Sequence, residues 1–497
     1  MSLNFNSLKK QLKSNQLSYN LRRIKSVYFY AKKQYQGQIR HTGEPLIKHP
    51  LSVAITLAEW GLDQLSIEGA LLHELPEIKP NHQEQITKKF GASLSNLVDG
   101  VHRVGSIKLR SSKDKVFLEN LRKMFVALAK DIRVVIIRLA DRLHNIKTLD
   151  AIPLSKQKRI AIETLEVYAP LAERLGMGKL KGELEDLVFP YIYPEEYAWV
   201  TNVARPHFKY SEENIKASIT KIRQILAKNG IAAKTDGRPK RKYSLYKKLL
   251  RPEIDGDITK VNDLMAVRII TEEDITCYTV LGLMHRYWKP VPYLGISDFI
   301  AQPKPNGYRS IHTKVFDHKG NILEIQIRSK HMHLQAEFGA AAHFAYSEAK
   351  SAGVKDHLLQ SGIAFKLDDK MAWVSELSNW KEQVESAHQQ EKDLKLDALS
   401  KHIYVFSPKG DVFDLPEDAT PIDYAFKVHT NLGFYISGIR INGKIGSISQ
   451  ALKSGDVVEI IKSKAVRPAS RNWLHLVKTA RAKNKIRKKL LDQEKLI

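Results

Sequence analysis

Two acidic residues near the middle of the chain, Glu324 and Asp263, have the type and placement that metal-assisted chemistry needs. Residues 322–328 alternate between apolar and polar side chains, which puts Glu324 on the polar face of a predicted strand. A second predicted strand begins just after Asp263. If the strands are neighbours, the two carboxylates can hold Mg²⁺ and activate a hydroxyl. The polar face can instead face water, and the alternation alone leaves both interpretations open.

A basic segment precedes these strands, starting at residue 237. If it is helical, Lys240, Ser244 and Lys248 lie four residues apart on one face. A hydroxyl between two ammonium groups suits the oxygens of a triphosphate, and Arg238 would be free to stack on a base. A solvated basic surface is the alternative, and this segment by itself favours it.

The loop between the two halves of this region carries an aromatic residue. Tyr308 follows Lys304, Pro305, Asn306 and Gly307. Proline and glycine around a tyrosine make a rigid turn that can offer the ring to a nucleotide base.

A second group of candidate residues lies near the N-terminus: His49, His73, Glu74 and Asp141. Taken singly, each histidine is more often a packed or surface residue than a ligand. Two histidines and two acids on helices can together form a Mn²⁺ or Zn²⁺ site that generates hydroxide.

Hydrophobic periodicity indicates which elements position these residues. Residues 1–196 read as almost continuous helix, and prolines at 190 and 194 end that pattern. A mixed region follows, with predicted strands at 266–270, 312–316 and 322–327. Residues 351–400 return to a polar helical pattern, residues 402–463 are rich in short strands, and the tail from residue 467 is basic and helical.

The composition fits a multidomain globular protein of 497 residues. Its 80 basic residues against 54 acidic ones give a net charge of +26, which favours polyanionic partners, although a solvated basic surface is the alternative. A single cysteine, Cys277, excludes disulfides within the chain and cysteine-rich zinc sites. We find no apolar run of signal-peptide or membrane-spanning length, so we expect a cytoplasmic protein without a membrane partner.

Six segments of the central region together resemble the synthetase domain of the RelA/SpoT-homologue family. They are GRPKRKYSLYKK, DLMAVRII, WKPVP, DFIAQPKPNGYRSIHT, LEIQIRS and AEFGAAAHFAY, in that order. The resemblance implies a nucleotidyltransferase-like mixed α/β domain that moves pyrophosphate from ATP to the 3′-hydroxyl of GDP or GTP. The hydroxyl attacks the β-phosphorus of ATP, and AMP leaves.

The same resemblance implies residue roles in the synthetase. Asp263 would ligate Mg²⁺, and Glu324 would help to bind it and activate the acceptor hydroxyl. Tyr308 would stack on guanine. The residues implied for ATP are Arg238, Lys240, Ser244 and Lys248, and those near the acceptor are Lys304, Asn306 and His312. One departure is the tetrapeptide at 295–298, Gly-Ile-Ser-Asp, where the family has a basic RxKD or acidic ExDD sequence, so metal dependence and the preference for GDP or GTP stay open.

The N-terminal region resembles the all-helical HD hydrolase domain of the same family, which removes the 3′-pyrophosphate. The implied metal ligands are His49, His73, Glu74 and Asp141, and Arg40 and Asn145 would approach the nucleotide.

Three features depart from the family pattern of this domain. Glu74 replaces an aspartate, and its extra methylene would displace the carboxylate; Ile78 replaces a carboxylate that helps to activate water; Pro76 falls where the helix turns into the site. We therefore expect weak or absent hydrolysis. The alternatives are a bifunctional synthetase and hydrolase, in which Glu74 and Glu77 suffice, and a non-catalytic regulator that binds tRNA or the ribosome.

Residues 404–411, 421–430 and 457–461 resemble a TGS domain, a small β-grasp module, in which His429 would contact the 3′ end of uncharged tRNA. The long members of the family continue into further modules, so we expect a chain shortened after the TGS domain, with tRNA or the ribosome as partners through that domain and the basic tail. The expected domains are a helical HD domain at 1–196, a synthetase domain at 197–350, a helical connector at 351–400, a TGS domain at 401–464 and a basic tail at 465–497.

Overall fold

The computed structural model describes residues 3–15, 19–105, 130–261, 264–292, 295–304, 306–317, 319–341, 402–408, 411–429, 431–453, 455–463 and 469–494. These fall into two compact units, one made of the described residues up to 341 and the other of those from 402 onward. The expected connector at 351–400 lies outside the described residues.

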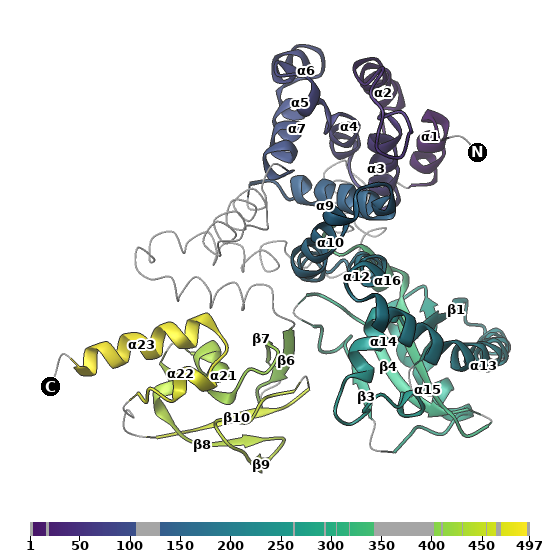
Figure 1. The fold of residues 1–497 in the computed structure, drawn as a ribbon. Helices are drawn as coiled ribbons and strands as arrows, with labels where there is room; N and C mark the ends of the chain where they lie inside the picture. The colour runs from purple at the N-terminus through teal and green to yellow at the C-terminus, as the bar shows by residue number, and fades with distance from the viewer. Residues whose placement is uncertain are drawn as a thin grey trace. The chain divides into compact units, whose positions relative to one another are not determined.

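The N-terminal part of the first unit is helical, as the periodicity predicts (Figure 1). Helix α7, for example, buries Leu94, Leu97, Val98 and Val101, which recur at helical spacing on one side. The elements are α1 (Phe5–Ser14), α2 (Leu21–Gln34), α3 (Lys48–Glu59), α4 (Gln64–Leu72), α5 (Leu75–Ile78), α6 (His82–Phe90), α7 (Ala92–Gly105), α9 (Ile132–Lys147), η1 (Leu149–Ala151), α10 (Leu154–Glu163), the π-helical turn η2 (Thr164–Tyr168), α11 (Ala169–Arg174) and α12 (Gly178–Ile192).

A 35-residue helix, α13 (Pro194–Lys228), then leads into the mixed region. Pro194 stands in its first turn, where a missing N–H has no cost. The helix therefore runs across the domain boundary expected at residue 196, because a proline at that end starts a helix as readily as it stops one. The domain boundaries themselves stay predictions.

A five-stranded mixed sheet follows, in the order β1-β2-β5-β4-β3. Strands β2 and β5 are parallel, and the other neighbours are antiparallel. The strands are β1 (Ala233–Pro239), β2 (Met265–Thr271), β3 (Ile296–Asp298), β4 (Ile311–Phe316) and β5 (Ile322–Ser329). The three strands predicted from the sequence are confirmed, whereas β1 and β3 were missed. The sequence of β1 is polar and contains glycine and proline, which are uncommon inside strands.

The two faces of this sheet differ in character. On one face, Val267, Ile325 and Ile327 join a buried core with α13 and with Cys277 and Met284 of α15 (Asp274–Tyr287). The opposite face carries polar side chains, because successive residues of a strand point to alternate sides. Helix α16 (Lys330–Phe338) contacts β2 and β5, and α14 (Lys242–Leu249) and η3 (Ile258–Lys260) form a further core with α13.

Within the first unit, the segment just before α12 packs closely against the segment that follows α16. Ala340 N donates to Leu175 O at 2.8 Å. Gly339 has a φ of 52°, and a Cβ there would collide with the carbonyl oxygen of Leu175. Only glycine permits this approach of two backbone segments.

The second unit contains the strand-rich region and the helical tail that the sequence predicts. Its strands are β6 (His402–Phe406), β7 (Val412–Pro416), β8 (Ile436–Ile441), β9 (Lys444–Ile445) and β10 (Val458–Lys462), and its helices are α21 (Pro421–Val428), η5 (Leu432–Tyr435), α22 (Trp473–Leu476) and α23 (Ala480–Glu494). Asp423 is fully buried and accepts from the backbone N–H groups of Thr420 and Thr479, at 2.9 and 2.8 Å. Its carboxylate thereby fastens the tail to α21, and Ile486 of α23 enters the core.

Among the described helices, none combines the length and apolar character that crossing a bilayer requires.

Candidate active sites

Four predicted ligands converge in the helical part of the first unit. His49 on α3, His73 and Glu74 after α4, and Asp141 on α9 each present one ligand atom, and these atoms lie within 4.8 Å of one another. His49 Nε2 is 3.2 Å from Glu74 Oε1, 3.1 Å from Asp141 Oδ1 and 3.3 Å from His73 Nε2. Lone pairs gathered this closely repel unless protons or a cation lie between them, so the donor set fits a divalent cation.

The orientation of His73 also fits a ligand. Its Nδ1 is 2.7 Å from the carbonyl oxygen of Ala70, so Nδ1–H donates there and the Nε2 lone pair faces the carboxylates. Burial alone would raise the pKa of Glu74, but its hydrogen bonds with His49 and His73 hold that pKa well below its ordinary value.

The predicted nucleotide-contacting residues extend from this cluster. Asn145 Nδ2 donates to Asp141 Oδ1 at 2.7 Å, and Arg40 Nη2 donates to Asn145 Oδ1 at 2.8 Å. Arg40 Nη1 is buried without a hydrogen-bond partner among the described residues. A donor in this state, next to a metal-type cluster, suits an anionic ligand.

Sequence reasoning missed two supporting residues of the cluster. Arg138 Nη1 lies 2.7 Å from Asp141 Oδ2, and His144 Nδ1 lies 2.9 Å from His49 Nδ1. Burial lowers the pKa of His144 to about 4, which keeps its ring neutral. The sequence did contain a signal for both residues. Arg138 and His144 are each three positions from Asp141, a spacing that puts side chains on neighbouring positions of a helix surface.

The departures from the family pattern have different structural outcomes. Glu74 reaches the cluster despite its extra methylene, which corrects the expectation that the longer side chain would be displaced. Pro76 stands in the first turn of α5, where it disturbs no hydrogen bond. Ile78 is half-buried and brings no carboxylate, and Glu77 is exposed.

The synthetase-like site lies on the polar face of the sheet. Glu324 on β5 accepts from Gln326 Nε2 at 2.9 Å, and its Oε1 is 3.4 Å from His312 Nδ1. His312 Nε2 is in turn 2.8 Å from the hydroxyl of Tyr308. With Nδ1 protonated, the ring donates to Glu324 and accepts from Tyr308. Burial lowers the pKa of His312, although Glu324 opposes that shift. Three predicted residues therefore form one hydrogen-bonded chain.

The other predicted acid, Asp263, lies outside the described residues. Ala266 of β2 pairs with Glu324 in the parallel β2–β5 ladder, so the strand that follows Asp263 neighbours the strand of Glu324. The shared Mg²⁺ site stays a prediction.

The loop at 304–308 is held by its own hydrogen bonds. Gly307 N donates to Lys304 O at 2.7 Å, and Tyr308 N donates to Asn306 Oδ1 at 3.1 Å. Tyr308 is half-buried and packs edge to face against Phe299 and His312. Lys304 Nζ lies 5.3 Å from the Tyr308 ring centroid, and burial lowers the pKa of Lys304.

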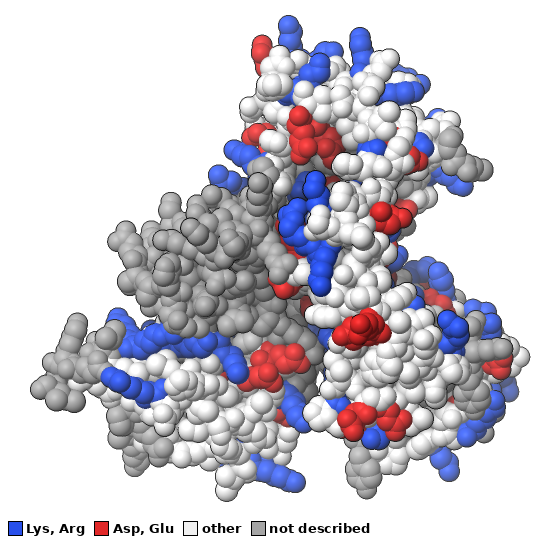
Figure 2. All heavy atoms as spheres, viewed as in Figure 1, with Lys and Arg blue, Asp and Glu red and all other residues white. Residues whose placement is uncertain are grey.

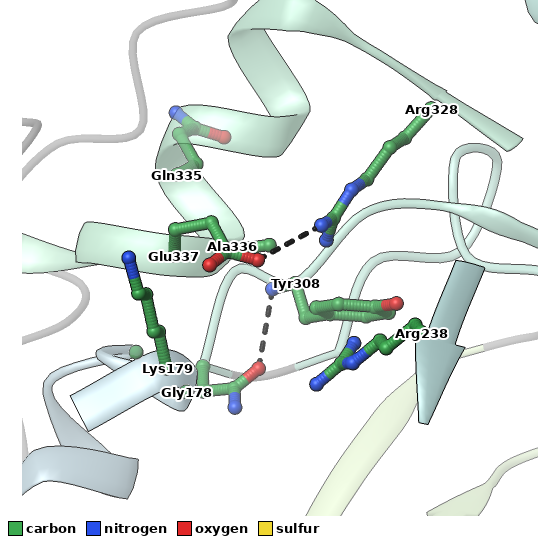
Figure 3. Close-up of a pocket in the computed structure, with 10 residues that line it drawn as sticks. Gly178, Lys179, Arg238, Tyr308, Arg328, Gln335, Ala336 and Glu337 are labelled. Atoms are coloured by element: carbon green, nitrogen blue, oxygen red, sulfur yellow. Dashed lines mark hydrogen bonds and ion pairs between the residues drawn. The ribbon is translucent and has the colours of Figure 1, made fainter. Parts of the chain in front are cut away.

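A pocket beside this loop brings together Arg238, Asn306 and Tyr308, three of the predicted nucleotide contacts (Figure 3). Its lining also includes residues that the sequence did not single out as contacts: Gly176, Gly178, Lys179, Arg328, Gln335, Ala336 and Glu337. Alternation along β5 gave a signal for Arg328. Lys179 and Glu337 gave none, because they reach the pocket only through the fold.

The remaining ATP-contact candidates do not line this pocket. Lys240 lies in the link between β1 and α14, so the single helix considered for Lys240, Ser244 and Lys248 is wrong at its first residue. Pro239 ends the strand directly before it. Ser244 and Lys248 do share α14, one turn apart, and Ser244 is exposed.

Asp298 is the acid that survives in the divergent tetrapeptide at 295–298. Its Oδ1 accepts from the backbone N–H groups of Ile300 and Ala301, both at 2.9 Å, and its Oδ2 accepts from the Tyr278 hydroxyl at 3.1 Å. The carboxylate is thus engaged in shaping the turn after β3.

In the second unit, His429 follows the last residue of α21 and is exposed. Figure 2 shows Lys and Arg side chains gathered along α23. That helix carries Arg481, Lys483, Lys485, Arg487, Lys488 and Lys489.

Comparison with family models assigns three regions of the chain. Residues 28–178 match the HD domain, residues 237–351 match the region found in RelA / SpoT proteins, and residues 403–462 match the TGS domain. All three resemblances expected from the sequence are therefore confirmed, as is the fold class of helical, mixed α/β and TGS domains.

Relatives with different printed activities match almost the whole chain. A GTP pyrophosphokinase of Myxococcus xanthus is 41% identical over 95% of this chain and 61% of its own length. A guanosine-3′,5′-bis(diphosphate) 3′-pyrophosphohydrolase of Aquifex aeolicus is 42% identical over 95% of this chain and 65% of its own. The bifunctional (p)ppGpp synthase/hydrolase SpoT of Escherichia coli K12 is 37% identical over 98% of this chain and 67% of its own. The chain thus spans about three fifths to two thirds of the length of these relatives.

Proposed function

The chain belongs to the RelA/SpoT family, and on that premise we propose that it transfers a pyrophosphate group from ATP to the 3′-hydroxyl of GDP or GTP. The observation that carries the proposal is the hydrogen-bonded chain from Tyr308 through His312 to Glu324, beside a pocket that also contains Arg238. It joins a surface for a purine base to a carboxylate that can accept a proton.

In the proposed reaction, Glu324 accepts the proton of the 3′-hydroxyl as that oxygen attacks the β-phosphorus of ATP. The bond from the β-phosphorus to the bridging oxygen breaks, and AMP leaves with that oxygen. His312 contacts both the Glu324 carboxylate and the Tyr308 hydroxyl and so fixes their relative positions. A base stacked on Tyr308 would therefore hold its 3′-hydroxyl in a defined orientation relative to Glu324. Arg238 and Lys304 contribute positive charge near the phosphates.

Asp263 and Glu324 would hold the Mg²⁺ ion, because carboxylate oxygens are its preferred protein ligands. Bound there, the ion would supply charge neutralisation for the transferred group. We also propose that this activity is cytoplasmic, because ATP and guanine nucleotides are available there. The preference between GDP and GTP is left open, because the one acid in the divergent tetrapeptide is engaged in a turn.

The test supplies purified protein with labelled ATP, GDP or GTP and Mg²⁺, and separates the products by anion exchange. We expect product from the wild type and none from Glu324→Gln. Glu272→Gln is the matched control, because Glu272 is an exposed acid of the same sheet region, paired with Lys330 at 2.6 Å. No product from the wild type, or full activity of Glu324→Gln, contradicts the proposal.

For the HD site we propose binding of a divalent cation such as Mn²⁺ with slow hydrolysis of the 3′-pyrophosphate. The convergence of two histidines and two acids supports the metal, and Ile78 at the position of a catalytic carboxylate supports the slow reaction. Incubation of the protein with (p)ppGpp and Mn²⁺ tests this. Turnover as fast as the synthesis reaction would favour a bifunctional enzyme instead.

For the second unit we propose binding of uncharged tRNA, or of ribosomal RNA, through exposed His429 and the basic face of α23. Polyanion binding of this type weakens as salt increases, because counterions are released on binding. Filter binding of labelled tRNA at two salt concentrations tests it. Affinity that does not change with salt, or with His429→Ala, would contradict the proposal. If the protein retained tRNA but neither made nor hydrolysed the nucleotide, the non-catalytic alternative would stand.

A further inference from the structure

Glu337 on α16 is an acid of the pocket for which the family resemblance gave no role. Its Oε1 lies 3.0 Å from Arg268 Nη1 and 3.0 Å from Arg328 Nη2. Within the described residues, neither of the hydrogen bonds of Glu337 uses its Oε2. The side chain is 15% exposed and lines the same pocket as Tyr308 (Figure 3). One oxygen therefore anchors Glu337, and the other is available to a ligand.

The neighbouring Arg328 has a donor group without an acceptor in the described part of the chain. Arg328 is 1% exposed, and its Nε–H has no hydrogen-bond acceptor among the described residues. A buried N–H without an acceptor costs about 1–3 kcal/mol, so such a group usually meets its partner in a bound ligand or water. Arg328 and Glu337 thus bring a donor and an acceptor to the same pocket.

The electrostatic surroundings keep the acceptor ionised. Burial alone would raise the pKa of Glu337, but Arg328 and Arg268 lower it below its ordinary value. An ionised carboxylate only accepts hydrogen bonds, and it repels a ligand atom that carries a lone pair.

The two common purines present opposite edges to such a pair. Guanine carries an acceptor at O6 and donors at N1–H and the N2 amino group, whereas adenine carries a donor at N6 and an acceptor at N1. A carboxylate beside an arginine N–H therefore matches guanine and opposes adenine. The side-chain amides of Asn306 and Gln335 also line the pocket, but an amide can donate or accept and does not discriminate in this way.

We propose that Glu337, through Oε2, accepts hydrogen bonds from N1–H and the N2 amino group of the acceptor base and so selects a guanine nucleotide. Arg328 Nε–H donates to O6 of the same base. The inference rests on the proposed function, because it takes the base stacked on Tyr308 to be the acceptor. It makes Glu337 a specificity-determining residue rather than a catalytic one.

The experiment compares GDP, IDP and ADP as acceptors for pyrophosphate from labelled ATP. IDP is guanosine diphosphate without the N2 amino group, so it tests one contact. Losing a hydrogen bond to a charged group should lower kcat/KM for IDP by about 10-fold or more relative to GDP, with most of the change in KM. Glu337→Gln should reduce that preference to a few-fold.

Asp236→Asn is the matched control. Asp236 pairs with Arg268 at 2.9 Å, as Glu337 does at 3.0 Å, but it does not line the pocket. If the preference arose from the overall charge of the arginine network, both variants would lose it. We expect Asp236→Asn to keep the wild-type ratio of GDP to IDP. A folded Glu337→Gln protein that kept the full preference would overturn the proposal.

A binding measurement separates this inference from the proposed reaction. Calorimetric titration of the wild type with GDP, IDP and ADP needs no turnover and no variant. Tighter binding of GDP than of IDP, in a protein that makes no product, would support the base contact while the proposed reaction fails. Equal binding of GDP and IDP would overturn the inference even if synthesis is observed.

Discussion

The two candidate sites of the first unit differ in the charged groups that form them. In the HD cluster, two carboxylates and two imidazoles converge on one point, with Arg138 and Asn145 fixing Asp141 from outside. In the synthetase-like site, Lys179, Arg238 and Arg328 line the pocket, and Glu337 is the one acid among its lining residues. The first arrangement attracts a cation, and the second attracts the phosphates of a nucleotide.

The two sites also differ in how their residues are held. The candidate ligands of the HD cluster lie on or directly after buried helices, and His73 and Asp141 are each fixed by a further hydrogen bond. Tyr308 instead lies on a loop and depends on His312 and on the loop's own hydrogen bonds. Substitutions in the HD cluster should therefore affect folding stability, whereas those at the loop should affect substrate binding.

The largest effect is expected for Glu324→Gln, which should lower the rate of pyrophosphate transfer by about 1,000-fold. The amide cannot accept the hydroxyl proton, and losses of this size are typical when a general base or a charge-stabilising group is removed. Steady-state assays with labelled ATP measure it. Mn²⁺ binding at the HD cluster should not change, and a parallel loss there would show that the sites are not independent.

Asp141→Asn should weaken Mn²⁺ binding by about 100-fold, because it removes a charged ligand of the cluster. It also leaves Arg138 without its buried carboxylate partner, so the free energy of unfolding should fall by about 3 kcal/mol. Electron paramagnetic resonance of bound Mn²⁺ and urea denaturation measure the two effects. Unchanged metal affinity would exclude Asp141 as a ligand.

Tyr308→Ala should raise the KM for GDP by about 10- to 100-fold, since stacking of a base on an aromatic ring contributes about 1–3 kcal/mol. Tyr308→Phe keeps the ring and loses only the hydrogen bond to His312, so its KM should change by no more than a few-fold. Initial rates at varied GDP distinguish the variants. Equal losses would assign the role of Tyr308 to its hydroxyl rather than its ring.

Ile78→Asp should raise the hydrolysis of (p)ppGpp in Mn²⁺ by about 10-fold, because it returns a carboxylate to the position where the family has one. Ile78→Asn is the control, because asparagine has the shape and polarity of aspartate but no charge. Release of pyrophosphate measures both variants. A rate that stays at the wild-type level would mean that another difference limits hydrolysis.

Some features of the protein follow from the sequence alone. Alternation at 323–328 predicted β5, because a two-residue period is a local property of a half-buried strand. The four residues of the metal-type cluster were also foreseen, because the N-terminal region resembles the HD domain. Neither inference needed knowledge of long-range contacts.

Other features were decided only by the tertiary structure. Lys240 was placed on a helix because the sequence does not record that residues 233–239 pair with β2. Glu74 was expected to be displaced, although the bend after α4 brings its carboxylate to His49. Glu337 meets Arg268 across 69 positions of sequence, and Lys179 reaches the same pocket from the helical region. Local periodicity determines elements, but the partners of a charged side chain depend on how distant segments pack, and that packing is what builds the pocket.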